Sequence, residues 1–524
     1  MKNLSLAFSA LALGVTDALS AQQTLLFTGR FPFVGLDAPN ERPGGAINDL
    51  SRYSFSYVTP GAGAFARSLL PATAMQCYIG DANNNDDYLK FDELATQSYF
   101  ANFQIGGLFV KWADRANVTW DRIYFTVRDN EAGADLEVFT NNGTGSHTLV
   151  PGDWVRFLPN GNVEFFMTAA DLAIAAGPPN TGGSSIDGCH TLVQTATGDL
   201  FYSPVQGGHW VNGNQGGPVF ANDGSIIKIA AADISYDPIS GNIASFVPNS
   251  ARLCIEEVNA GSSSNSRTIR SMIGAAGAFD NQGLPILGTS GNTVLGKISG
   301  LGLDPLGGTF TTTFPDAAGN YTTEPDLIFT ADSGRYAGTI FSTANNGSIA
   351  TINGQLCGSN LAGVPATGAW LGVQLDVPNF QPTVMGLTLV DALEYEPLLL
   401  DAPNNGVIDL AASQPSFDLD LNGAPTTLAF LVLAFGPNTP GLFPPSVPLS
   451  AIPVGFVDSH ADVFTATNTV TIGLLLTDPN GYAAYQVANP NVGGYTNIRF
   501  VIQAAAALNS GGVQVSTPVI TELR

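Results

Sequence analysis

Short runs in which apolar and polar residues alternate recur along most of the chain. Alternation with a period of two is typical of strands that bury one face. Helical spacing of apolar residues is confined to three short segments, 92–97, 168–176 and 267–274. The pattern therefore predicts an all-β protein, with strands that include residues 123–127, 153–158, 162–167, 225–229, 326–330 and 339–342.

Several predicted strands are joined by dipeptides that favour tight turns. Asn-Gly at 160–161 and 346–347, and Asp-Gly at 223–224, place glycine where a two-residue hairpin needs positive φ. Hairpin segments of similar composition recur at 152–172, 198–237 and 325–352. Such repetition is typical of propeller blades or another radial β array, although turn chemistry alone also generates it. Residues 21–393 are therefore predicted to form either a propeller-like or a multi-hairpin region.

The texture of the chain changes after this region. Charged residues become rarer and apolar runs lengthen, as in FDLDLNGAPTTLAFLVLAF at 417–435. The Asn-Gly pair at 422–423 lies between two alternating runs, so we expect a two-residue hairpin there. Further strands are expected at 470–475 and 498–503. Residues 394–524 are therefore predicted to be a separate C-terminal β-sandwich.

The first residues have the pattern of a secretory signal peptide. Lys2 gives a short positive start, an apolar run covers 4–15, and small residues follow between Ala18 and Ala21. A membrane anchor is the alternative, but this run is too short to cross ~30 Å of hydrocarbon, and no later segment has ~20 uninterrupted apolar residues. Residues 1–20 are therefore predicted to be a signal peptide of an exported protein without an integral membrane span.

Composition bears on the partners that the protein can have. Hydrophobic residues make up 44% of the chain and charged residues 12%, a balance that favours packed domains over disorder. The formal net charge of −24 repels phosphate backbones and anionic lipids. We therefore expect no nucleic-acid partner and no binding to an anionic membrane surface.

The four cysteines are widely spaced, which excludes the paired CxxC ligands of zinc and redox sites. In an exported protein they allow two disulfide bridges, and the alternative is that they pack as buried thiols. The sequence favours at least one bridge and does not fix its pairing. The residues are Cys77, Cys189, Cys254 and Cys357.

The most specific motif is the segment GDANNNDDYLKFDE at 80–93. Oxygen-bearing side chains occupy alternate positions, as in loops that wrap around Ca²⁺, a hard cation that takes about six to eight oxygen ligands. The segment resembles the calcium loops of EF-hands and dockerin modules, except that Asp86 replaces the turn glycine and aspartate replaces the final glutamate. A strand expected at 75–79 favours a calcium-loaded hairpin loop; a solvated turn is the alternative. The candidate metal ligands are Asp81, Asn83, Asn85, Asp87 and Asp92.

A glycine-rich region at 184–217 holds a second candidate site. None of the four histidines belongs to an HExxH motif, which argues against a zinc-protease site. If these loops fold together, one aspartate, two histidines and a tryptophan form a metal, acid–base or ligand-binding site. The alternative is that they are separate, with the tryptophan covering a β core. The residues are Asp187, His190, His209 and Trp210, and Trp210 is expected in a loop.

Signatures of well-known catalytic sites are missing from the sequence: it has no nucleophile elbow, phosphate-binding loop or dinucleotide fingerprint. Two hypotheses follow. The first is a secreted or cell-envelope protein with a structural, adhesive or ligand-binding role, stabilised by calcium. The second is a polysaccharide-active hydrolase that uses two carboxylates, since glycoside hydrolysis needs only such a pair. The expected partner is an extracellular polysaccharide or a cell-surface protein, and the oligomeric state is left open.

One resemblance covers most of the chain. The export signal, the loop at 80–93, the recurrent hairpins and the segment IRFVIQAAAALNSGGVQVSTPVITEL at 498–523 resemble the large secreted β-rich proteins of planctomycete-type bacteria. The C-terminal segment is the most similar part. This resemblance implies an extracellular location and transfers no catalytic residue.

Overall fold

The computed structural model describes residues 23–29, 55–58, 67–70, 79–81, 105–127, 136–139, 146–148, 150, 152–157, 163–176, 189, 191–204, 209–211, 219–221, 224–255, 298–312, 314–316, 318–331, 340–343, 351–352, 355–356, 384–393, 398–401, 407–408, 416–423, 426–435, 469–479, 481–488, 498–507, 513–516 and 519–523. Most of them lie in strands, which confirms the all-β prediction. The helix predicted at 168–176 is present as α5 (Ala169–Ala176), whereas 92–97 and 267–274 lie outside the described residues. Within the described part, no helix is long and apolar enough to cross a membrane.

The larger sheets among the described N-terminal residues are four in number. Their strand orders are β26-β1-β2-β3, β5-β6-β9-β10, β11-β12-β15-β18 and β19-β22-β23. The first sheet consists of β26 (Val384–Val390), β1 (Thr24–Gly29), β2 (Phe55–Val58) and β3 (Arg67–Leu70). The second consists of β5 (Ile105–Val110), β6 (Ile123–Val127), β9 (Trp154–Phe157) and β10 (Val163–Met167). The third consists of β11 (Val193–Gln194), β12 (Leu200–Tyr202), β15 (Ile226–Ile229) and β18 (Arg252–Ile255). The fourth consists of β19 (Ile298–Leu303), β22 (Leu327–Ala331) and β23 (Phe341–Ser342).

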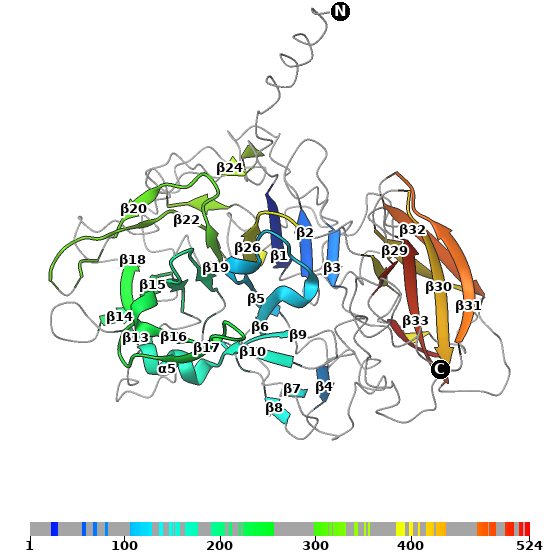
Figure 1. Ribbon diagram of the computed structural model, residues 1–524, viewed down its shortest axis with the longest axis horizontal. Coiled ribbons are helices and arrows are strands. Elements are labelled where there is room, and N and C mark those ends of the chain that lie inside the picture. Colours follow the sequence, from blue (N-terminus) through cyan, green and yellow to red (C-terminus); the bar gives the residue numbers. More distant parts are fainter. Residues whose placement is uncertain are drawn as a thin grey trace, which may run out of the picture.

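One edge strand of each sheet takes part in a closed cycle of contacts. These four strands are β26, β5, β11 and β19. β26 contacts β5 and β19, and β11 also contacts β5 and β19. Figure 1 shows β19, β26, β1 and β5 side by side in the middle of this part of the molecule. The cycle closes through distant segments of the chain, because β1 pairs antiparallel with β26 and places Leu26 opposite Thr388. The four sheets are therefore arranged around a common centre.

Smaller elements are inserted between the strands of these sheets. The hairpins are β13 (His209–Val211) with β14 (Val219–Ala221), β16 (Ile234–Tyr236) with β17 (Ile243–Phe246), β20 (Thr309–Thr311) with β21 (Thr323–Pro325), and β24 (Thr351–Ile352) with β25 (Gln355–Leu356). A further sheet contains β4 (Ile79–Asp81), β7 (Leu136–Phe139) and β8 (Ser146–Thr148). The 3-10 helices among the described residues are η3 (Trp112–Asp114), η4 (Trp120–Arg122) and η5 (Ala231–Asp233).

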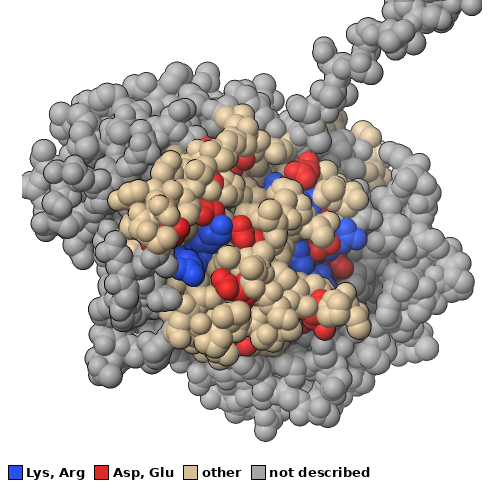
Figure 2. All heavy atoms as spheres, turned by 60° about the vertical axis from the view of Figure 1, so that its left-hand side comes forward, with Lys and Arg blue, Asp and Glu red and all other residues tan. Residues whose placement is uncertain are grey.

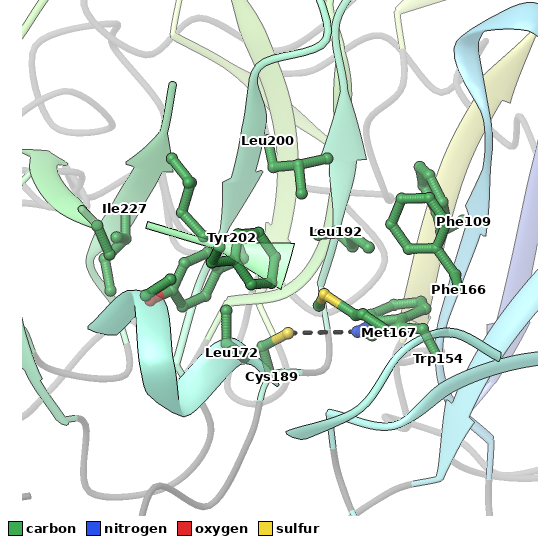
Figure 3. Packing of buried hydrophobic residues seen from close by; sticks show 14 of the residues in the cluster. Phe109, Trp154, Phe166, Met167, Leu172, Cys189, Leu192, Leu200, Tyr202 and Ile227 are labelled. Carbon is green, nitrogen blue, oxygen red and sulfur yellow. Dashed lines mark hydrogen bonds between the residues drawn. The ribbon is translucent and has the colours of Figure 1, made fainter. Parts of the chain in front are cut away.

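Large apolar side chains fill the spaces between neighbouring sheets. Figure 3 shows Phe109 of β5 and Trp154 of β9 on one side of a cluster that includes Tyr202 and Ile227 of the next sheet and Leu172 of α5. A second cluster joins that sheet to the fourth one; it includes Phe201, Ile255, Leu301, Phe329 and Phe341. The alternating strand pattern thus buries apolar side chains between sheets, which is the main driving force for this packing.

Glycines allow the central strands to approach closely. A Cβ atom on Gly386 of β26 would lie 2.7 Å from the backbone nitrogen of Leu108 and 2.8 Å from Cα of Gly107, both in β5. On the other side of β26, a Cβ atom on Gly300 of β19 would lie 2.6 Å from Cβ of Leu387. At these glycines, the backbone of β26 therefore packs directly against β5 on one side and β19 on the other.

The C-terminal part forms two facing sheets, at the right of Figure 1. The smaller sheet contains β27 (Leu399–Asp401), β29 (Ser416–Asn422) and β32 (Tyr482–Ala488). The larger contains β28 (Val407–Ile408), β35 (Val519–Leu523), β33 (Ile498–Ala507), β30 (Leu428–Phe435), β31 (Thr469–Leu476) and β34 (Val513–Val515). Leucine and alanine side chains from both sheets form one buried core between them.

The hairpin predicted at 422–423 is wrong. β29 pairs with β27 and β32, whereas β30 pairs with β31 and β33, so the two strands lie in different sheets. The N–H of Gly423 donates a hydrogen bond to the carbonyl of Gly481 at 2.9 Å. The reason is apolar burial: the sheet-crossing lets Leu421 and Leu431 share the core between the two sheets.

Candidate ligand pocket

The predicted calcium loop begins where a strand ends. Asp81 is the last residue of β4 and lies opposite Leu136 of β7. The other predicted ligands, Asn83, Asn85, Asp87 and Asp92, lie outside the described residues. Among the residues with a described position, no three His, Cys, Asp or Glu side chains gather in a way that would hold a metal ion. The calcium loop therefore stays a prediction.

The second predicted site is only partly described, and one of its residues was misplaced. His209 and Trp210 lie in strand β13, so the prediction that Trp210 lies in a loop is wrong. Tryptophan and valine favour strands, Val211 is buried, and β13 pairs with β14. Asp187 and His190 lie outside the described residues, so their convergence with His209 stays a prediction.

Two of the four cysteines have described positions, and both are thiols. Cys189 and Cys254 are buried in different core clusters. The indole N–H of Trp154 donates a hydrogen bond to the sulfur of Cys189 at 3.3 Å, drawn as the dashed line in Figure 3. Burial raises the pKa of Cys189 to about 12 and also raises the pKa of Cys254. Both thiols therefore stay protonated at neutral pH and are poor nucleophiles.

A pocket of about 360 Å³ lies between the third sheet and the β20–β21 hairpin. Its volume falls in the range of about 300–1,000 Å³ typical of small-molecule sites. Two strands of the sheet, β15 and β18, contribute one wall, and the hairpin with its turn contributes the other. The lining residues are Lys228, Ala230, Arg252, Leu253, Cys254, Thr312, Phe314, Asp316, Ala318, Thr322 and Glu324.

Lys228 is the charged centre of the inner wall. Its ammonium nitrogen lies 2.7 Å from Oε2 of Glu324 and 3.1 Å from Oδ2 of Asp199. It also lies 5.6 Å from the centre of the Phe201 ring. Burial alone would lower the pKa of Lys228, but hydrogen bonds and charge from Glu324 and Asp199 outweigh burial and raise it. Lys228 is therefore held as a cation by two carboxylates.

Asp199 lies behind this wall and is held from two sides. The N–H of Ala231 donates to its Oδ1 at 2.7 Å, and Lys228 pairs with its Oδ2. Burial by itself would raise the pKa of Asp199, but these hydrogen bonds and the charge of Lys228 lower it. Asp199 is therefore ionised across the neutral pH range.

Arg252 is the neighbour of Lys228 on the adjacent strand. The two residues are direct cross-strand partners in β15 and β18. Like charges directly opposite one another destabilise a sheet unless other groups compensate them. Carboxylates compensate Lys228, whereas Arg252 forms no ion pair with any residue that the structure describes. Figure 2 shows that lysine and arginine side chains gather in two places on this side of the molecule, with acidic side chains beside them.

The hairpin wall is fixed by hydrogen bonds of its own. Oδ1 of Asp316 accepts hydrogen bonds from the N–H groups of Ala318 and Asn320 at 2.9 and 2.8 Å. The hydroxyl of Thr322 donates to Oε1 of Glu324 at 3.1 Å. Both oxygens of the Glu324 carboxylate are therefore engaged, one by Thr322 and the other by Lys228.

A second cluster of charged side chains surrounds Tyr124 of the second sheet. The Tyr124 hydroxyl lies 3.1 Å from Oε2 of Glu164 and 2.9 Å from Oδ1 of Asn242. The Nε of Arg156 donates to the same Glu164 oxygen at 2.5 Å. Lys111 lies over the Tyr124 ring. Burial is the main cause of a strongly raised pKa of Tyr124, so this phenol stays protonated and the group has a structural character.

Sequence reasoning did not single out Lys228, Arg252 or Glu324. One signal was present, because Lys228 is the charged residue in the apolar strand SIIKI at 225–229. A lysine in such a run has to find an acidic partner or solvent. Glu324 lies 96 residues away, so no local pattern identifies it as that partner.

Comparisons with known proteins leave the family open. No protein-family model matches the chain, and no curated protein sequence matches it. Among solved structures, a "Ca2+-stabilized adhesin" of an Antarctic bacterium that binds ice is 11% identical with a TM-score of 0.15, over 80% of this chain and 100% of that one. A tandem-repeat structure from a large adhesion protein is 12% identical with a TM-score of 0.15, over 80% and 99%. A Salmonella alpha-2-macroglobulin is 9% identical with a TM-score of 0.19, and 97% of this chain spans only 33% of it. Scores this low carry no argument about fold or function.

Proposed function

We propose that this chain is a secreted extracellular or cell-envelope protein with a structural or adhesive role, and that it binds a sugar ligand of a polysaccharide or cell-surface partner in the Lys228 pocket. The observation that carries the proposal is a pocket of about 360 Å³ whose central cation is already neutralised by two carboxylates. The volume suits a small polar ligand. Export is supported by the predicted signal peptide at 1–20.

The charge arrangement supports binding over hydrolysis. Glycoside hydrolysis needs one carboxylic acid that can donate a proton and a second carboxylate nearby. The lowered pKa of Asp199 opposes the first role, and Asp199 does not line the pocket. Both oxygens of Glu324 already accept hydrogen bonds. Asp316, the other carboxylate of the pocket lining, accepts two backbone hydrogen bonds at Oδ1 as part of the hairpin turn.

Filling the pocket tests this function. Ala318 is exposed at the turn of the hairpin wall, so Ala318→Trp should occupy the pocket without disturbing a core. We expect the purified chain to be retarded in gels that contain one or more extracellular polysaccharides, and Ala318→Trp to lose at least about tenfold in affinity, as when a hot-spot contact is removed. Ile239→Trp, in an exposed turn that does not line the pocket, is the control and should bind normally.

The same assay decides between the two hypotheses. Release of reducing sugar ends from a bound polysaccharide would contradict a binding role and favour the hydrolase. Equal binding by Ala318→Trp and Ile239→Trp would show that the ligand site lies elsewhere on the chain.

We also propose that calcium stabilises the loop at 81–92. The support is the alternate spacing of its oxygen-bearing side chains and the start of the loop at the end of β4. Saturation a thousandfold above the dissociation constant should add ~4 kcal/mol to the domain that holds the site. We expect excess Ca²⁺ to raise the thermal midpoint of the wild type and not that of Asp81→Ala, with Asp114→Ala as a charge-matched control. A midpoint that is the same in Ca²⁺ and in chelator would refute the site.

A further inference from the structure

Among the described residues, Lys228 has two carboxylate partners and its neighbour Arg252 has none. The two cations face each other across β15 and β18, in a chain with 43 acidic and only 19 basic residues. Lys228 is paired with Glu324 and Asp199, and no described carboxylate pairs with Arg252. Arg252 is therefore the cation of the pocket wall without an ion pair among the described residues, although the carboxylates of Asp316 and Glu324 also line the pocket.

The other residues that line the pocket indicate the chemical class of a ligand that would pair with Arg252. Thr312 and Thr322 place hydroxyl-bearing side chains along the hairpin wall, and Phe314 adds an aromatic ring. Aromatic faces suit sugar rings and hydroxyls suit their alcohol groups, while the planar fork of an arginine matches a carboxylate. The volume of about 360 Å³ leaves room for a ligand of sugar size.

We infer that the pocket recognises a carboxylated sugar unit, such as a uronic acid residue of an acidic polysaccharide, whose carboxylate pairs with Arg252. The inference rests on the proposed binding function and names the ligand class. Glu324 pairs with Lys228 through Oε2 and accepts a hydrogen bond from Thr322 at Oε1, and it forms no ion pair with Arg252. A ligand carboxylate in this position would pair with Arg252 as Glu324 and Asp199 pair with Lys228.

The net charge of −24 does not decide against an acidic ligand. Exposed charges further away than about 8 Å are largely screened at physiological ionic strength. Arg252 is half-buried in the wall of a pocket, where contact with a carboxylate is screened much less. The local cation therefore governs binding of one acidic sugar unit, although the whole chain repels extended polyanions at low salt.

The test compares one trisaccharide in two charge states. We would titrate the full chain with α-1,4-linked trigalacturonate and with its fully methyl-esterified form by calorimetry, using wild type, Arg252→Met and Arg252→Lys. The wild type should bind the acid form at least about tenfold more tightly than the ester, since hydrogen bonds between charged groups are about twice as strong as neutral ones. Arg252→Met should bind both forms alike, and Arg252→Lys should keep part of the preference because it keeps the charge but lacks the planar fork.

The outcomes separate this inference from the proposed function. Equal binding of acid and ester by the wild type, or a preference that survives in Arg252→Met, would overturn the inference and leave the binding function standing. Binding of neither trisaccharide, together with no retardation by any polysaccharide, would overturn both. The thermal midpoint of Arg252→Met should be close to that of the wild type, because Arg252 forms no ion pair with a described residue. A loss of binding with an unchanged midpoint is therefore a loss of recognition.

Discussion

Gly386→Ala is expected to lower the free energy of unfolding by about 3 kcal/mol, at the upper end of the usual cost of overpacking a core. The added Cβ atom would lie 2.7 Å from the backbone nitrogen of Leu108 and 2.8 Å from Cα of Gly107. These are backbone atoms of β5, so relief requires movement of a strand in the central cycle. Urea denaturation followed by far-ultraviolet circular dichroism measures the change.

Gly302→Ala is the matched control for this prediction. Gly302 lies in β19, another strand of the central cycle, and its added Cβ atom would lie 3.1 Å from Cγ1 of Ile328 and 3.8 Å from the nitrogen of Leu389. A side chain that yields by a few tenths of an ångström should limit the cost to less than about 1.5 kcal/mol, as in well-tolerated core changes. Equal losses in Gly386→Ala and Gly302→Ala would contradict the close backbone packing of β26 against β5.

The closed cycle of sheets also shows where sequence reasoning stops. Period-two alternation placed the strand at 123–127 where β6 (Ile123–Val127) lies, and it placed the strand at 162–167 within one residue of β10 (Val163–Met167). These are local properties, because one buried face fixes which residues alternate. The partner of a strand is a different matter. The pairing of β1 with β26 joins residues near 24 to residues near 390, and no local signal announces it.

The hairpin expected at 422–423 failed for a related reason. An Asn-Gly pair favours a tight turn, but the turn preference is smaller than the gain from burying both flanking strands in the shared core. Leu421 and Leu431 both lie in that core, one from each of the two sheets. The Asn-Gly pair therefore correctly marked the end of one strand and the start of the next. It wrongly predicted that these two strands pair with each other.

The pocket was not predictable for a further reason. Its charged residues come from β15 and β18 and from a hairpin that follows much later in the chain, and each alone is an ordinary strand or turn residue. Only the contact between Lys228 and Glu324 turns them into a site. The motifs that sequence reasoning does recognise, such as the loop at 80–93, carry their ligands within one short segment. Sites assembled from distant single residues need the fold first.

Lys228→Met is expected to destabilise the protein by about 3 kcal/mol, because removing one partner of a buried ion pair leaves an uncompensated charge. The substitution leaves the carboxylates of Glu324 and Asp199, each at least four-fifths buried, without the cation between them. Lys111→Met is the matched control, since Lys111 is also buried but donates its hydrogen bond to the carbonyl oxygen of Ser240. The loss of unfolding free energy in Lys111→Met should be clearly smaller than that in Lys228→Met. Guanidinium denaturation at pH 7 measures both.

The pH dependence of this difference has a definite sign. The folded state lowers the pKa of Asp199, so the stability that its carboxylate contributes is present above its unfolded pKa of about 3.9 and is lost as the pH falls through the folded value. The raised pKa of Lys228 means that its contribution is present below about pH 10.4 and is lost only as the pH rises through the higher folded value. The gap in unfolding free energy between wild type and Lys228→Met should therefore be wide at pH 7 and begin to narrow as the pH falls below about 3.9, where the stability that the Asp199 carboxylate contributes is progressively lost. A gap that is constant between pH 7 and pH 3 would mean that Lys228 stabilises the sheet through the packing of its methylene groups against Phe201 and not through its charge.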